Sequence, residues 1–491
     1  MEYDWGSIHQ SGTREEMMRP FSRPKTNGWR IRPREQRTIL LSGDLIVSVL
    51  ALLGGLYFWG QKDAWLSFSL DFLKERVELW FYLLPLVWMV FLVEIYDLHR
   101  ARNLRQTASW IAIAAFAGIL IYALIYLISP KGSLPRWGIG FFLIFASLLT
   151  LIWRLVYIRI FTAQAFLRRV LVIGAGKAGE TIARAYNELH TQPFFLVGFM
   201  DDDSNKIGKK VEEFPILAGN DRLLETVNAE GITEIIIAIS GAMQGTTFQA
   251  ILDAQEVGVE IVPMPTVYEE LLGRVPVHHL ESDWLIRSFV DEARVGGFYE
   301  AGKRLMDIFG GLVGSAIFLV FYPVIAIFIM LESGRPVIYK QVRLGKGGRP
   351  YPVTKFRTMC QDAEKDGKAQ LTQENDSRIT RVGNFLRRTH IDEWPQFLNV
   401  VRGEMSLVGP RSERPEWIAE FQKQIPFYRA RLLVKPGITG WAQVNYSYYA
   451  TVEEMAVKLE YDLYYIKHRN MLMDILILFR TFTQVLAFRG R

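Results

Sequence analysis

The sequence predicts a membrane protein of three parts: an α-helical transmembrane bundle, a cytoplasmic α/β domain, and a small α+β domain with a re-entrant membrane helix. Four long apolar stretches lie in the first 160 residues, short apolar strands alternate with helix-like segments after them, and a fifth apolar stretch follows near residue 303. Half of the 491 residues are hydrophobic, which is too many for an ordinary soluble enzyme. The predicted parts are an N-terminal tail (1–37), the bundle (38–165), the α/β domain (166–298) and the C-terminal domain (299–491).

The four N-terminal apolar stretches each approach the ~20 residues that a helix needs to cross a bilayer. Basic residues before the first stretch, between the second and third, and after the fourth predict a cytoplasmic N-terminus and a chain that returns to the cytoplasm. Asp44 and Glu94 lie in or near these spans, where acids are candidates for function, although bundle partners or water can also satisfy them. The spans are predicted at 38–60, 79–96, 108–129 and 138–160.

A glycine-rich turn opens the middle domain. The strand VLVI runs into Gly174-x-Gly176-x-x-Gly179 and then a helix, and a second strand ends about 25 residues later at Asp201. This context is typical of a dinucleotide-binding Rossmann-like domain, in which the glycines approach a phosphate and the acid binds a ribose. The same glycines also form a tight strand–helix turn with nothing bound, and we expect that role here rather than a bound NAD or other nucleotide.

The fifth apolar stretch, residues 303–331, is predicted to enter the membrane and return. From Leu305 to Leu331 a straight helix would be ~40 Å long, against a hydrocarbon core of ~30 Å. Both of its flanks are basic, which does not suit a crossing. Pro323 offers a break, because proline removes a helix hydrogen bond and clashes with the preceding turn.

The stretch HIDEWPQ places two adjacent carboxylates, Asp392 and Glu393, among basic segments. Such a pair can hold Mg²⁺ or attack phosphorus, and either role needs cations to neutralise phosphate oxygens. Alone, an Asp-Glu pair is common at a helix start, and arginines beside a membrane also bind anionic lipid headgroups. The clustering of these segments therefore favours a phosphate-handling site. The candidate phosphate-binding residues are Arg387, Arg411, Arg357 and Lys355.

Charge and cysteine content narrow the function classes. The formal charge is only +6, so we expect no nucleic-acid partner, and the single cysteine, Cys360, excludes a disulfide framework or a cysteine metal site.

Three long motifs resemble one family. KFRTM, RVGNFLRRTHIDEWPQFLNVVRGEMSLVGPR and KPGITGWAQVN are similar to motifs of the bacterial sugar transferases, the polyprenol-phosphate phosphoglycosyl transferases with one re-entrant helix. The layout with four membrane helices and a Rossmann-like domain resembles the larger members. The resemblance implies transfer of a hexose 1-phosphate from a UDP-hexose to undecaprenyl phosphate with release of UMP, at the start of exopolysaccharide, capsule or O-antigen synthesis. It also implies a bacterial inner-membrane location among lipids, and a homodimer is expected.

The resemblance implies residue roles as well. Asp392 matches the nucleophile, which takes the phosphosugar covalently, and Glu393 matches its partner at a Mg²⁺ site. Arg387 and Arg411 match phosphate-binding arginines, and Pro323 matches the helix-breaking proline. His390 could act as a general base, but a carboxylate that attacks phosphorus does not require one.

Two other functions stay open at this point. A membrane-anchored NAD-dependent nucleotide-sugar dehydratase can share the four spans and the Rossmann-like domain, but no Tyr-x-x-x-Lys pair follows the glycines. A non-catalytic scaffold for polysaccharide assembly is the second alternative. The sequence does not choose the sugar, for which glucose and galactose are the expectations.

Overall fold

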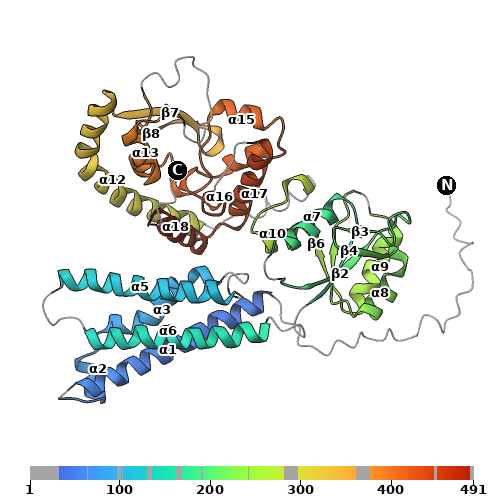
Figure 1. The fold of residues 1–491 in the computed structure, drawn as a ribbon, viewed down its shortest axis with the longest axis horizontal. Helices are drawn as coiled ribbons and strands as arrows, with labels where there is room; N and C mark the ends of the chain where they lie inside the picture. The colour runs from blue at the N-terminus through green and yellow to red at the C-terminus, as the bar shows by residue number, and fades with distance from the viewer. Residues whose placement is uncertain are drawn as a thin grey trace, which may run out of the picture. The chain divides into compact units, whose positions relative to one another are not determined.

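The computed structural model describes residues 33–486 except 64, 97–100, 102, 130–134, 162–167, 190–191, 242, 281–296, 361–375, 377 and 447–450. Most of the predicted N-terminal tail lies outside these residues. The chain forms two compact units that divide after Met264 (Figure 1).

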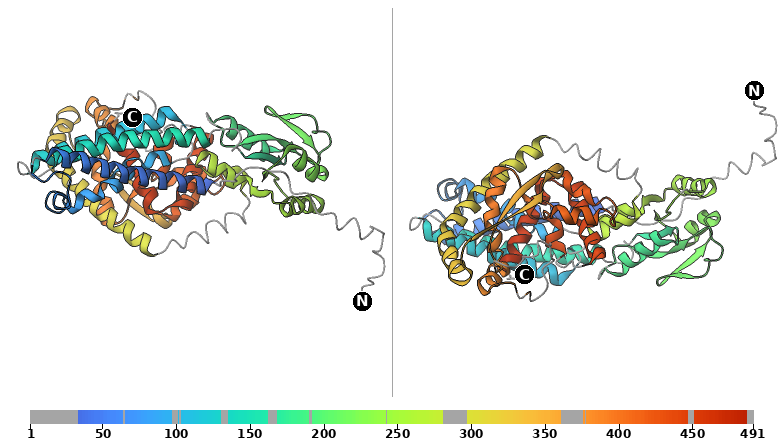
Figure 2. Two further views of the ribbon diagram at one scale, coloured as in Figure 1. Left: turned by 90° about the horizontal axis from the view of Figure 1, so that it is seen from below. Right: turned by 90° about the horizontal axis from the view of Figure 1, so that it is seen from above.

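Three long helices of the N-terminal region lie where three of the spans are predicted. They lie side by side along their length in Figures 1 and 2 and are long and apolar enough to cross a membrane. Many of their large apolar side chains are exposed, as expected for residues that face lipid. The helices are α1 (Pro33–Lys62), α5 (Leu104–Ile128) and α6 (Arg136–Phe161).

The second predicted span, 79–96, differs from the prediction, because it is not one helix. An eight-residue α-helix, α3 (Leu84–Phe91), lies between two 3₁₀ turns, η2 (Leu79–Leu83) and η3 (Val93–Tyr96). Pro85 stands in the first turn of α3, where its missing N–H costs no helix hydrogen bond, whereas inside a helix it would remove one and clash with the preceding turn. A short helix, α2 (Leu70–Glu75), precedes this segment.

A buried ion pair satisfies Asp44. Arg154 of α6 lies 2.5 Å from the Asp44 carboxylate of α1, and both side chains are fully buried. Arg154 also donates to the carbonyl of Ile95 at 2.9 Å. Asp44 is therefore paired with another residue of the bundle, which is the structural role predicted from the sequence as the alternative to a functional one. The side chain of Glu94 lies outside the described residues.

The middle domain is a parallel sheet with helices on both faces, as predicted. The strand order is β3-β4-β2-β1-β5-β6, and only the β3–β4 hairpin is antiparallel. Helix α7 covers one face, and α8 and α9 pack together on the other (Figure 1). The strands are β1 (Arg169–Ile173), β2 (Phe195–Met200), β3 (Lys210–Val211), β4 (Phe214–Ala218), β5 (Glu234–Ile237) and β6 (Glu260–Pro263). The helices are α7 (Lys177–Asn187), η5 (Asn220–Arg222), α8 (Leu223–Glu230) and α9 (Gly245–Glu256).

The C-terminal unit begins earlier than residue 299. Helix α10 (Met264–Leu272) and turn η6 (Val277–His279) belong to it, which corrects the predicted boundary at 298. Glu269 forms an ion pair with Lys467 at 3.1 Å, and the carbonyl of Gly273 accepts from Trp441 Nε1 at 2.8 Å. These contacts join the segment to distant parts of the C-terminal unit, and no local sequence pattern signals them.

The rest of this unit surrounds two small sheets. The hairpin of β7 (Ile338–Leu344) and β8 (Pro350–Phe356) is antiparallel, and β9 (Ser406–Val408) pairs in parallel with β10 (Gly437–Thr439). The α-helices are α12 (Gly297–Ser333), α13 (Arg381–Arg388), α14 (Phe397–Arg402), α15 (Pro415–Phe421), α16 (Trp441–Asn445), α17 (Val452–His468) and α18 (Met471–Leu486). The 3₁₀ turns are η7 (Lys346–Gly348), η8 (Ile391–Gln396) and η9 (Tyr428–Leu433).

Helix α12 is continuous through Pro323 instead of forming two separate helices. It changes direction along its length in Figure 1, as expected where a proline removes one hydrogen bond from a helix. Its large apolar side chains are exposed on one side, and its small residues pack inward. The exposed ones include Phe309, Leu312, Leu319, Val320, Val324, Phe328 and Leu331.

Candidate active site

The carboxylate pair lies on turn η8, directly before α14. His390 begins the turn in the left-handed conformation, with φ 57°. This reverses the chain after α13 and brings Asp392 and Glu393 inward, where they are 9% and 8% exposed. Trp394 and Pro395 follow them and continue the turn into α14. The local sequence therefore buries two neighbouring acids, which requires compensating charges.

Two predicted cations converge on Glu393. Lys355 Nζ of β8 lies 2.6 Å from Glu393 Oε1, and Arg411 Nη2 lies 2.8 Å from the same oxygen. Burial alone would raise the pKa of Glu393, but Arg411 and Lys355 outweigh it and hold the pKa well below its usual range. Glu393 is therefore ionised and fixed in position.

Asp392 has different surroundings. Burial and the adjacent Glu393 charge raise its pKa to about 6, although Lys355, Arg387 and Arg411 oppose this. Within the described ranges, no side chain forms a hydrogen bond or ion pair with the Asp392 carboxylate. A buried carboxylate without a partner, close to three cations, is available to react with an anionic phosphate.

Arg387 approaches from the end of α13. Its Nε donates to Thr358 Oγ1 at 2.9 Å, and this is the only hydrogen bond of its side chain to the described residues. Burial lowers its pKa, while the nearby Asp392 and Asp376 charges act in the opposite direction. Its terminal nitrogens are thus available for a ligand, consistent with the predicted phosphate-binding role.

Arg357 contacts the end of α12. Its Nη2 donates to the carbonyl oxygen of Ser333 at 2.6 Å, to Ser333 Oγ at 2.8 Å, and to the carbonyl of Gly334. It therefore caps the C-terminus of α12, where carbonyls lack helical partners. This arrangement gives Arg357 a structural role at the helix end, and its contact with substrate phosphate stays a prediction.

Sequence reasoning missed a second pair beside Arg387. Arg378 Nη2 lies 2.6 Å from Asp376 Oδ2, and Arg378 Nε donates to Asp376 Oδ1 at 2.9 Å. Both residues contribute to the electrostatic surroundings of Arg387. The DSRIT stretch that directly precedes α13 contains both residues, but no motif in it signals that they pair.

Helix α12 is anchored to the catalytic region near both ends. Near its start, Arg304 donates to the carbonyls of Val400 and Val401 at 2.9 and 2.8 Å, and Asp307 accepts from Ser406 Oγ at 2.9 Å. At its end, Glu332 accepts from the backbone N–H groups at the start of α13. A 37-residue helix thus contacts the same domain near both of its ends.

The bend of α12 lies close to the catalytic turn. The ring of Phe321 packs edge-on against Trp394, with 5.9 Å between centroids, and Tyr322 stacks on Phe356 at 6.0 Å. Trp394 directly follows the carboxylate pair. Pro323 therefore stands where the apolar helix meets the polar site.

The glycine turn of the middle domain is closely packed at its first and third glycines, Gly174 and Gly179, whereas Gly176 has open space around it. Gly174 has φ +105°, and a Cβ at Gly179 would lie against the Gly174 carbonyl. Asp201 Oδ2 accepts from Ala175 N at 2.8 Å and pairs with Lys206 at 3.0 Å. The glycines thus fit the tight-turn interpretation, and the predicted ribose-binding acid already has partners within the turn.

Comparisons with known proteins identify both halves of the chain. Residues 298–488 match the model of the bacterial sugar transferases, and residues 92–265 match a CoA-binding domain. A UDP-N-acetylgalactosamine-undecaprenyl-phosphate N-acetylgalactosaminephosphotransferase of Aeromonas hydrophila is 40% identical over 47% of this chain, and the match spans only 53% of that relative.

Two UDP-glucose:undecaprenyl-phosphate glucose-1-phosphate transferases match over longer stretches. The Escherichia coli K12 protein is 34% identical over 64% of this chain and 67% of its own length. The Xanthomonas campestris pv. campestris protein is 28% identical over 82% of this chain and 85% of its own length. The chain belongs to the bacterial sugar transferase family.

Proposed function

We propose that the protein transfers a hexose 1-phosphate from a UDP-sugar to undecaprenyl phosphate and releases UMP. The observation that carries this proposal is the unpaired, buried Asp392 beside an ion-paired Glu393 and three cations. Phosphoryl transfer depends mainly on positioning and on charge stabilisation, which this arrangement supplies. The activity would begin the synthesis of an exopolysaccharide, a capsule or an O-antigen, as the family resemblance implies.

The proposed reaction has two steps. Asp392 attacks the phosphorus that bears the sugar, so that a carboxylate–phosphorus bond forms and the bond to UMP breaks. The leaving UMP keeps the electron pair. An oxygen of undecaprenyl phosphate then attacks the same phosphorus and releases the Asp392 carboxylate. Neither step needs a proton to be removed from the nucleophile, so His390 is not required as a general base.

The three cations approach the carboxylates from different segments of the chain and would stabilise different charges. Arg411 and Lys355 hold Glu393 and lie beside Asp392, where they can also meet phosphate oxygens. Arg387 approaches from α13 with its terminal nitrogens available. The planar fork of an arginine suits two oxygens of one phosphate.

A divalent cation such as Mg²⁺ fits the donor set. Proteins usually hold Mg²⁺ with one or two carboxylates plus substrate phosphates, and Asp392 and Glu393 supply two carboxylates. The described residues contain no group of three or more metal-binding side chains, so substrate oxygens would have to complete the site. When bound, the metal would neutralise charge on the diphosphate.

The fold also supports a re-entrant arrangement of α12 in a bacterial inner membrane, with both extramembrane domains in the cytoplasm. Both ends of α12 contact the same domain, while its exposed face is apolar. A lipid-borne acceptor could then approach along α12 to the polar site at Pro323. To test this, Cys360 is replaced by Ser, and new cysteines at Gly297 and Lys346 are labelled from either side of the membrane. Labelling of the two from opposite sides would contradict the arrangement.

A panel of UDP-sugars is needed to identify the donor. One matching relative is named for UDP-N-acetylgalactosamine and another for UDP-glucose. Both of these donors are therefore tested, together with UDP-galactose. The purified protein is mixed with each donor and undecaprenyl phosphate, and UMP release is measured. With donor alone, mass spectrometry is expected to find a phosphosugar adduct on Asp392. Turnover without the adduct would contradict the two-step reaction, and no UMP release with any donor would contradict the function.

A further inference from the structure

The loop that carries Arg411 is held at every backbone carbonyl. Residues 410–413 connect β9 to α15, and each of their four carbonyl oxygens accepts a hydrogen bond. Two donors are backbone N–H groups, and the other two are buried or half-buried guanidinium groups. The pairs are Gly437 N to Pro410 at 2.9 Å, Arg431 Nη2 to Arg411 at 3.1 Å, Arg343 Nη1 to Ser412 at 3.2 Å, and Leu344 N to Glu413 at 3.2 Å.

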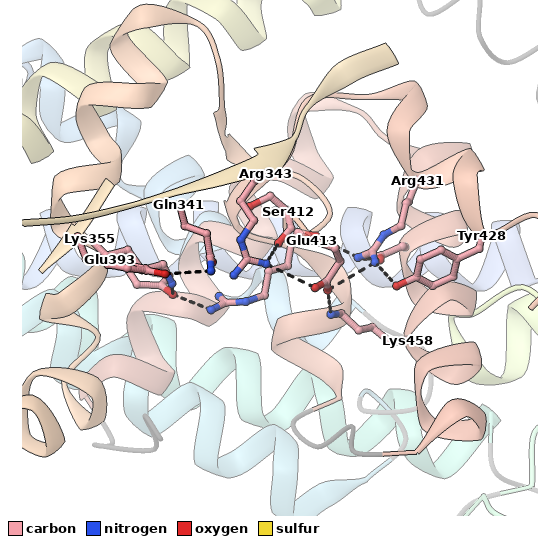
Figure 3. A network of polar contacts seen from close by, with 12 residues as sticks. Gln341, Arg343, Lys355, Glu393, Ser412, Glu413, Tyr428, Arg431 and Lys458 are labelled. Carbon is pink, nitrogen blue, oxygen red and sulfur yellow. Dashed lines mark hydrogen bonds and ion pairs between the residues drawn. The ribbon is translucent and has the colours of Figure 1, made fainter. Parts of the chain in front are cut away.

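The side chain of Glu413 lies within ion-pair distance of both guanidinium groups, and Arg431 Nη1 also donates to Tyr428 Oη at 2.8 Å. The Glu413 carboxylate lies 3.5 Å from Arg431 Nη1 and 3.8 Å from Arg343 Nη1, and Lys458 of α17 lies 2.6 Å from it. Asp462, one turn further along α17, pairs with Arg431 Nη2 at 2.8 Å. Figure 3 shows Glu413 between Arg343, Lys458 and Arg431, with Glu393 and Lys355 further along the same row.

The acid and its two closest cations in this cluster are almost completely buried. Arg431 is only 4% exposed, and Glu413 and Lys458 are equally buried. Lys458 and Arg431 overcome the effect of burial and hold the pKa of Glu413 at about 2, so Glu413 itself stays ionised at any working pH. Buried ion pairs are a poor source of stability compared with apolar packing, and specificity of geometry is their best-attested use. Here the geometry that they specify is that of the loop beside Glu393.

We propose that Glu413 is a positioning residue, which holds Arg343 and Arg431 against the loop carbonyls and thereby sets Arg411 at Glu393 to receive the donor phosphate. The second half of this statement rests on the proposed function. The first half concerns only the loop and can be tested without any substrate.

The substrate-free test is hydrogen–deuterium exchange of the full-length protein in lipid nanodiscs. In Glu413→Gln, the peptide that covers residues 407–414 is expected to exchange faster than in the wild type, while α18 stays unchanged. A second variant, Glu413→Gln/Lys458→Met, removes both partners of the closest pair and leaves no unpaired lysine, so it remains informative if the single variant folds poorly. Unchanged exchange of the loop in both variants would overturn the positioning role.

The matched control is Glu269→Gln. Glu269 is also a buried acid of the C-terminal unit with a lysine partner, Lys467, but it contacts no part of the 410–413 loop. It is expected to leave the exchange of that loop and the kinetics for the donor unchanged. An equal effect of Glu269→Gln would mean that the loop responds to any lost ion pair, and this would also overturn the proposal.

The kinetic test separates positioning from general destabilisation. Glu413→Gln is expected to lower kcat/KM for the UDP-sugar by about ten- to a hundredfold, because small displacements of substrate-binding groups have effects of this size. In an Arg411→Ala background the same change should add almost nothing, because the residue through which it acts is gone. Independent, multiplying losses would refute action through Arg411. A wild type without UMP release would refute the proposed function alone, since the exchange result stands by itself.

Discussion

Asp392 and Glu393 are neighbours in the chain, yet only Glu393 is ion-paired, with Lys355 at 2.6 Å and Arg411 at 2.8 Å. The pKa of Glu393 is held low, and that of Asp392 is raised to about 6. Two carboxylates whose surroundings separate their ionisation have different roles. Glu393 is the member that pairs with the cations, and Asp392 is the member to which we assign the reactive role in the proposed function.

The first prediction concerns Asp392→Asn. We expect it to abolish UMP release with the fold intact, because an amide cannot displace UMP. We also expect the variant to melt at a higher temperature than the wild type in metal-free buffer at pH 7.5. Burial of the charged form costs stability above the raised pKa of about 6, and the amide removes that cost.

The sign of the pH dependence follows from the two pKa values. Below the unfolded value of 3.8 the carboxyl is protonated in both states, so the advantage of the amide should vanish there. Between about 4 and 6 the wild type should lose stability relative to the variant as the pH rises. Thermal melts from pH 4 to 8 measure this, and a variant that is less stable than the wild type at pH 7.5 would contradict the assignment.

Arg357 and Arg387 should behave in opposite ways when each is replaced by lysine. Arg357→Lys loses hydrogen bonds to the carbonyls at the end of α12, so we expect a loss of about 1.5–3 kcal/mol of stability with kcat/KM nearly unchanged. Arg387→Lys should lower kcat/KM for the donor about tenfold or more with little loss of stability, because a point charge replaces a two-pronged donor. Chemical denaturation and initial rates for both variants measure the contrast. Equal losses of kcat/KM in the two variants would show that Arg357 also contributes to substrate binding.

The difference between these arginines shows how far the sequence can predict the site. Both lie in basic motifs, and Lys355, two residues before Arg357, does reach Glu393. Strand β8 ends at Phe356, so the alternation that directs Lys355 no longer governs Arg357. The carboxylate pair, Arg387 and Arg411 could be predicted because local motifs contain them.

Contacts between distant segments could not be predicted in this way. Asp44 lies 110 positions from Arg154, and Glu413 lies 45 from Lys458. No periodicity or motif links such residues, because their pairing is decided by how helices pack. The same holds for residues 265–280, which were assigned to the middle domain but pack with the C-terminal unit. The long spans and the parallel sheet were predictable, since their signals are local and repeated.

The packing of α12 against α14 gives a further prediction. A Cβ at Gly314 would lie 2.5 Å from the ring of Phe397, the first residue of α14 after the catalytic turn. We expect Gly314→Ala to cost about 1–3 kcal/mol of stability through overpacking and to slow transfer, because it pushes on the element that follows Asp392.

Gly302 provides the matched control in the same helix. The nearest atom to a Cβ there is Met471 Sδ at 3.5 Å, an ordinary contact. Gly302→Ala should be neutral or should stabilise the helix by up to about 1 kcal/mol. Melting temperature and UMP release are compared for the two variants. If both alanines act alike, the effect of Gly314→Ala does not come from Phe397.

The buried pair of the bundle, Asp44 and Arg154, should matter for stability and not for chemistry. Arg154→Met leaves a fully buried carboxylate without its cation, and breaking such a pair typically costs about 3–5 kcal/mol. The double variant Asp44→Leu/Arg154→Met leaves no charge behind and should recover most of that loss. Thermal melts of the detergent-solubilised full-length protein measure both, with the phosphosugar adduct on Asp392 as the check on the catalytic domain. If the double variant is as unstable as the single one, the loss does not come from the unpaired Asp44 charge. The cause would then be the Ile95 carbonyl, which loses its hydrogen bond from Arg154 in both variants.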